Sequence, residues 1–148
     1  MKEHNRLRLL RLTARYARRL EEGRTPDEGD FLREFQALRA ELLQPKLEEL
    51  AEVLRLAGHD TRVVIDQGHD TPSIEIALGL RAATGSRNVV GFCVIRWKGY
   101  PLQILAYLEV NAPPFDLERF ARASEITPER VEQIVVDAIE HVVMCNAP

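Results

Sequence analysis

The chain has 148 residues, of which 45% are hydrophobic and 29% charged, with a formal net charge of −3 at pH 7. This size predicts a single domain, and ordinary apolar content with a small net charge argues against disorder. No stretch approaches the roughly 18 uninterrupted apolar residues of a membrane span, and arginines interrupt the N-terminal leucines, which argues against a signal peptide. With only two cysteines there is no disulfide framework, so we expect a cytoplasmic protein.

Positive charge is concentrated at the start of the chain. Residues 1–24 contain eight basic and three acidic residues, a net charge of +5, and the remaining residues therefore carry −8. We call residues 1–24 the basic arm. The domain is expected to span residues 1–148, with this arm as an amphipathic helical extension.

Two stripes run along the expected helix of the basic arm. One stripe is apolar and recurs at the three- and four-residue spacing of a helical face: Leu9, Leu12, Tyr16 and Leu20. The other lies one position away and is basic: Arg8, Arg11, Arg15 and Arg18. Such a helix could hold phosphates or an anionic membrane surface. It could equally pack on the acidic remainder of its own chain, or on a second copy.

A second helical region is expected after the Gly- and Pro-containing segment 23–29. Asp30 is the expected N-cap, followed by apolar residues at helical spacing from Phe31 to Leu42. The apolar pattern restarts one residue out of phase at Leu43, beside Pro45. We therefore predict a kink, or two consecutive helices, at Gln44–Pro45. Gly58 is the expected left-handed C-cap.

The middle of the chain changes to the two-residue period of β-strands, expected at 62–66, 73–80, 89–97 and 102–110. The connections between them are too short for crossover helices, which predicts an antiparallel meander. Helical periodicity then returns: Asp116 is expected to cap a short helix ending at Ser124, and Thr127-Pro128 to start the last helix. The predicted fold is α+β: N-terminal helices, a four-stranded antiparallel meander, and C-terminal helices packed on one face of the sheet.

A repeated Gly-His-Asp-Thr sequence is the clearest candidate for metal binding, through His59 and Asp60 or His69 and Asp70. An extended segment between the two copies would separate them by roughly 33 Å, which argues against a joint site. The same residues are also common in turns. We therefore expect no metal site.

Catalytic and cofactor-binding patterns are weak. Cys93 is expected in the middle of a strand, as an inert buried thiol, and Cys145 lies close to the C-terminus. Neither a phosphate-binding P-loop nor a dinucleotide-binding fingerprint occurs in the sequence. No cofactor is expected, and the sequence favours a protein that is not an enzyme.

One segment resembles the helix-turn-helix of bacterial DNA-binding proteins. Ala121, Glu125 and Val131 occupy its characteristic positions, and Thr127 would cap the recognition helix. The resemblance implies a DNA-binding regulator that uses residues 117–144. The sequence departs from the pattern at Glu125, where the motif has Gly. The expected recognition helix is acidic, which disfavours contact with phosphates, so any nucleic-acid binding would depend on the basic arm.

A third function class is a small-ligand pocket lined by aromatic side chains. Trp97, Tyr100 and Tyr107 lie near the expected end of a hairpin, where aromatic rings often line grooves.

The function that the sequence favours is a non-enzymatic protein-interaction or adaptor module. The charge is segregated, and the apolar helix stripes exceed what one face of a four-stranded sheet would cover. The surplus predicts self-association, most simply as a homodimer. The expected contact surface is the arginine stripe: Arg8, Arg11, Arg15 and Arg18.

Overall fold

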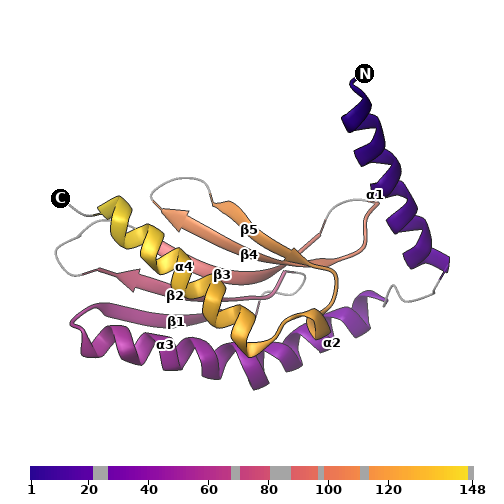
Figure 1. Ribbon diagram of the computed structural model, residues 1–148. Coiled ribbons are helices and arrows are strands. Elements are labelled where there is room, and N and C mark those ends of the chain that lie inside the picture. The colour runs from indigo at the N-terminus through magenta and orange to yellow at the C-terminus, as the bar shows by residue number, and fades with distance from the viewer. Residues whose placement is uncertain (22–26, 68–70, 81–87, 97–98, 111–113, 147–148) are drawn as a thin grey trace.

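The computed structural model has an α+β architecture with one antiparallel sheet (Figure 1). It describes residues 1–21, 27–67, 71–80, 88–96, 99–110 and 114–146. The sheet strands occur in chain order: β1 (Asp60–Asp66), β2 (Ser73–Gly79), β3 (Asn88–Ile95), β4 (Gln103–Val110) and β5 (Phe115–Phe120). The helices are α1 (Glu3–Glu21), α2 (Glu28–Leu38), α3 (Gln44–Leu56) and α4 (Pro128–Asn146).

The predicted antiparallel meander is confirmed, but it has five strands and not four. Each strand pairs only with its sequence neighbours, as short connections require. The fifth strand, β5, occupies most of the segment that we predicted as a short helix from Asp116 to Ser124. Only a single 3₁₀ turn, Ala123–Glu125, is helical there.

The capping function predicted for Asp116 is therefore wrong. The register between β4 and β5 shifts between Ala106 and Tyr107, so that Phe120 pairs with Ile104 while Asp116 pairs with Tyr107. This irregularity places Asp116 and Arg119 close enough for an ion pair of 2.5 Å. It also directs Phe120 into the core, where it is 5% exposed. Tertiary pairing thus overrides the local capping preference.

The helical region before the sheet begins one turn earlier than predicted. Asp27, not Asp30, is the N-cap of α2, and its carboxylate accepts a hydrogen bond of 2.7 Å from the Asp30 amide. The one-residue phase slip predicted beside Pro45 takes the form of a π-helical turn, Arg39–Leu43, which continues into α3. A π turn adds one residue, so both apolar stripes can face the sheet.

Gly58 ends α3 as predicted, with φ of +95°. Its amide donates to the Arg55 carbonyl at 2.9 Å, and the His59 amide donates to the Leu54 carbonyl at 3.1 Å. This pair of bonds is a Schellman motif. The residue at the position of Gly58 has a left-handed backbone conformation, which glycine adopts easily because it has no Cβ. At the other end of the domain, Thr127 caps α4 as predicted, since its hydroxyl accepts from the Arg130 amide at 3.2 Å.

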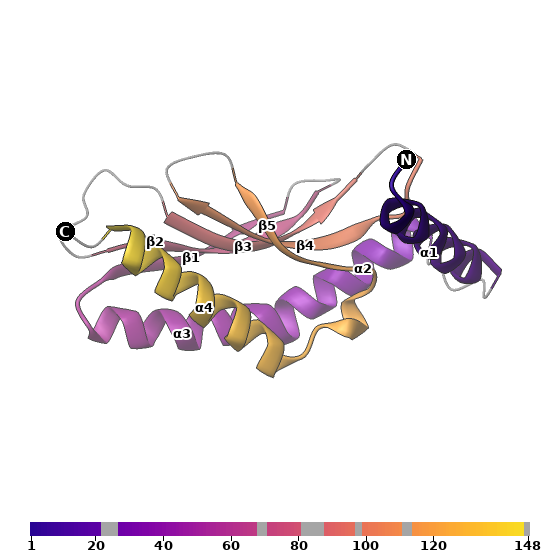
Figure 2. The same cartoon turned by 45° about the horizontal axis from the view of Figure 1, so that its top comes forward.

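The hydrophobic core lies between one face of the sheet and a single layer formed by α2, α3 and α4 (Figure 2). Alternate strand residues point into this layer, as Ile74, Ile76 and Leu78 do from β2. Phe35, Leu43 and Leu47 supply fully buried side chains from the helices; the other fully buried large residues include Phe92, Ile104, Leu108 and Val131. None of the described helices is long and apolar enough to cross a membrane.

Arg39 is a buried cation that ties the helical layer to the β1–β2 hairpin. It is only 8% exposed, and its Nη1 donates to the carbonyl oxygens of Asp66 at 3.0 Å and Ser73 at 3.2 Å. Asp66 and Ser73 are paired residues at the turn end of the hairpin. The guanidinium therefore closes that end of the sheet from the helical side.

Arg39→Met should lower the free energy of unfolding by about 2 kcal/mol. The substitution keeps the apolar stem of the side chain but removes both charge-assisted hydrogen bonds. Urea denaturation followed by circular dichroism would measure the change. Arg33→Met is the matched control, since Arg33 lies on the exposed side of α2 and forms a surface ion pair with Asp30. Its effect should stay within about 0.5 kcal/mol, and equal effects of the two substitutions would contradict the structural importance of Arg39.

Candidate interaction surface

α1 is the described helix none of whose apolar side chains enters the core. Leu9, Leu10 and Leu12 are 52%, 54% and 51% exposed, and Tyr16 is 43% exposed. By contrast, α2, α3 and α4 each place several side chains in the core. All residues from Met1 to Tyr16 are exposed. The helix extends away from both the sheet and the helical layer (Figure 1).

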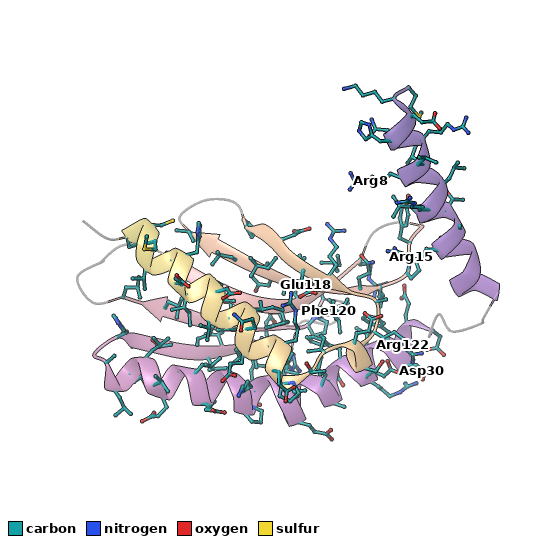
Figure 3. The ribbon with its side chains drawn as sticks, in the orientation of Figure 1. Arg8, Arg15, Asp30, Glu118, Phe120 and Arg122 are labelled. Carbon is teal, nitrogen blue, oxygen red and sulfur yellow. The ribbon has the colours of Figure 1, made fainter. Side chains whose placement is uncertain are left out.

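The described arginines of the basic stripe also lack ion-pair partners in the part of the chain that the structure describes. Arg8, Arg11 and Arg15 form no ion pair with any residue that the structure describes, although Arg6 lies 3.9 Å from Glu3. Arg8 and Arg15 are labelled on the same side of the helix in Figure 3, as two turns of separation require. Arg18 and Leu20 belong to α1, but their side chains are outside the described part of the structure.

Three arginines outside α1 behave differently, because each pairs with a carboxylate of another secondary structure element. Arg122, which follows β5, pairs with Glu34 of α2 at 2.8 Å. The Arg96 guanidinium, next to β3, lies 2.5 Å from Glu28 of α2 and lowers the pKa of that carboxyl. Arg130 of α4 pairs with Glu118 of β5 at 2.6 Å. These three arginines therefore hold elements of the fold together, whereas Arg8, Arg11 and Arg15 have no ion pair with a described residue.

The second uncovered surface is the sheet face opposite the helices, which we call the open sheet face. No described helix lies over it (Figure 2). Strand alternation and register assign it five carboxylates and two arginines. The carboxylates are Asp60, Asp66, Glu75, Glu109 and Asp116. The arginines are Arg62 and Arg119. Apolar side chains lie among them: Val64, Ala77, Val89, Cys93, Ile95 and Leu105.

Tyr107 lies at the centre of the open sheet face, and its side chain extends over Gly91 to contact Glu75. Its hydroxyl donates a hydrogen bond of 2.7 Å to Glu75, on the strand beyond β3. Gly91 separates them in the register, and a Cβ there would lie 2.5 Å from the tyrosine oxygen. Glycine thus permits the aromatic ring to lie against the backbone. Burial and the Glu75 carboxylate raise the pKa of Tyr107, which keeps its phenol protonated and able to donate.

Cys93 is beside this cluster and is poorly suited to nucleophilic chemistry. Burial, together with the negative charges of Asp116 and Glu75, raises the pKa of its thiol to about 11. A thiol catalyst needs the opposite shift. The prediction of an inert thiol thus agrees with its surroundings, although Cys93 lies half-buried on the open sheet face and not in the main core.

The other candidate residues do not assemble into a site among the described residues. His59 and Asp60 lie at the start of β1, while His69 and Asp70 fall outside the described residues. No group of three potential metal ligands occurs in the described part of the chain. Tyr100 is 67% exposed in the turn before β4, away from Tyr107 in the middle of that strand, and Trp97 is not described.

The predicted helix-turn-helix is not formed. Its first helix would include residues that belong to β5 and to the 3₁₀ turn, and only its second helix corresponds to α4. The periodicity of apolar residues could not reveal this, because Phe115, Leu117 and Phe120 combine two-residue and three-residue spacings across the irregularity in β5.

The surroundings of Cys93 predict slow alkylation. At pH 8 about one thiol in a thousand should be ionised, given its pKa of about 11. Iodoacetamide should therefore modify the exposed Cys145 well before Cys93, and the Cys93 rate should rise roughly tenfold for each pH unit up to about 11. Peptide mass spectrometry would measure both rates. Faster modification of Cys93 than of Cys145 at pH 8 would contradict this assignment.

Comparison of the chain with protein-family models, with curated proteins and with solved structures gives no match.

Proposed function

We propose that this protein is a protein-interaction module that self-associates and uses α1 as its contact surface. The single observation that carries the proposal is the state of α1: a helix of 19 residues with an apolar stripe about half exposed and three arginines unpaired with any described residue. Most helices in proteins gain their stability by burying such a stripe. A stripe left uncovered next to charged groups is typical of a surface that binds a partner.

The energetics support a protein partner. Covering the exposed half of a leucine side chain is worth about 1 kcal/mol, so three leucines and Tyr16 offer several kcal/mol to a partner that supplies an apolar surface. The adjacent arginines favour a partner that also carries carboxylates, because Arg binds them with two parallel hydrogen bonds. An adaptor function requires only these two features and no catalytic group.

DNA binding is the alternative function, because the arginines of α1 could contact phosphates. Without a helix-turn-helix, affinity would come from phosphate contacts alone and would fall steeply with salt. Titration of a random duplex at about 50 mM salt separates the two functions: we expect no binding there. The small-ligand alternative has less support, because Tyr100 and Tyr107 do not come together.

Replacement of Arg8, Arg11, Arg15 and Arg18 by Glu should weaken self-association or partner binding by about tenfold or more. The fold should be unaffected, because the described side chains of α1 contribute nothing to the core. Sedimentation velocity over a concentration series would measure association. Urea denaturation would measure stability, which should change by less than about 0.5 kcal/mol.

The matched control replaces the same four arginines by Lys, which keeps the charge and the helix. This variant should associate far more strongly than the Glu variant. If the Glu variant unfolds, α1 is a structural element and the assignment of a contact surface is wrong. Unchanged association of a folded Glu variant would likewise overturn the proposal.

A further inference from the structure

We infer that α1 of one copy binds the open sheet face of a second copy, and that the exchange is reciprocal. This inference rests on the proposed function and names the partner of the same surface. It accounts for both uncovered surfaces with one contact. In a twofold dimer each copy would give one helix and receive one, so that the contact occurs twice.

The chemistry of the open sheet face complements that of α1. Among the described residues, the face carries five carboxylates and two arginines, a net charge of −3. Arg62 pairs with Asp60, and Arg119 pairs with Asp116. The basic arm carries a net charge of +5. Opposite net charges favour encounter and orient the helix, while like charges would repel a wrong partner.

Apolar groups on the face lie where a helix stripe would need them. Leu105 and Cys93 are paired neighbours on β4 and β3, and Ile95 lies two residues from Cys93 on the same side. Val64 of β1 is 43% exposed on this side of the sheet. Leu105, Cys93 and Ile95 form an apolar patch toward the Ile95 end of β3, beside the row that contains Glu75 and Tyr107. An apolar patch next to charged groups corresponds to the apolar and arginine stripes that run side by side on α1.

The dimensions also agree. A helix of 19 residues is about 28 Å long, and the eight-residue strands β3 and β4 are about 26 Å long. Five strands span about 19 Å between the outer strand axes. One α1 can therefore lie along the strands with its apolar stripe on Leu105, Cys93 and Ile95 and its arginine stripe toward neighbouring carboxylates of the face.

The position of α1 favours a second copy over the helix's own sheet. In the single chain, α1 points away from both layers, and its stripe from Leu9 to Tyr16 remains exposed (Figures 1 and 2). The chain thus presents a helix and a complementary face that do not meet each other. A second copy supplies both at once, and two identical contacts double the buried area of the dimer.

A charge-exchange experiment tests this inference. The helix variant carries Arg8→Glu, Arg11→Glu and Arg15→Glu, and the face variant carries Glu109→Lys and Asp116→Lys. Each variant alone brings like charges together and should dissociate about tenfold more readily than the wild-type dimer. An equimolar mixture should form a heterodimer, because the reversed helix meets the reversed face while the two unchanged surfaces meet each other. Sedimentation velocity with one variant fluorescently labelled would measure this recovery.

The control replaces two exposed acids of α4 on the helical side, Glu129→Lys and Glu140→Lys. It makes the same charge change as the face variant and should leave the dimer intact. An equimolar mixture that remains monomeric would overturn binding of α1 to a second copy. If association recovers only in a chain that carries both sets of changes, α1 contacts the open sheet face of its own chain. If only the helix variant weakens association, the proposed function holds but this inference fails. If neither variant weakens association, the proposed function and this inference are both wrong. Both are also wrong if the wild-type protein is monomeric and binds no protein through α1.

Discussion

The five-stranded sheet buries only one of its faces, beneath the single layer formed by α2, α3 and α4, and this one-sided burial governs how the remaining surfaces are arranged. α2, α3 and α4 all pack against the same face of the sheet. The opposite face must therefore carry polar groups or be covered by another element. It carries a mixture, in which carboxylates lie among apolar side chains. α1 has the complementary mixture and does not join the helical layer, so both surfaces stay uncovered in the single chain.

The described arginines fall into two groups, those that pair within the fold and those of α1 that have no ion pair with a described residue. Within the domain, buried Arg39 closes the β1–β2 hairpin, and Arg96, Arg122 and Arg130 join helices to strands through ion pairs. The planar fork and permanent charge of arginine suit these multiple contacts. On α1 the same residue has no partner among the described residues at three positions. The contacts that the structure describes within the fold therefore do not account for these three arginines.

At the centre of the open sheet face, local packing determines how Tyr107 and Glu75 meet. Tyr107 reaches Glu75 only because Gly91 leaves space for its ring. The same burial and negative charges that keep Tyr107 protonated also raise the pKa of Cys93. Such surroundings disfavour a reactive thiol or phenolate. They are compatible with a face that binds an apolar and basic surface.

The α+β class, the antiparallel meander, the amphipathic basic helix and the caps at Gly58 and Thr127 could be predicted from the sequence, because they depend on local periodicity and on backbone preferences of single residues. The strand at residues 115–120 could not, since the free edge of β4 offers hydrogen bonds that outweigh a local capping preference. The burial of Arg39 and the contact of Tyr107 with Glu75 across Gly91 also depend on tertiary packing. Contacts between residues more than 25 positions apart leave no periodic signal in the chain, so they become visible only once the strands have paired.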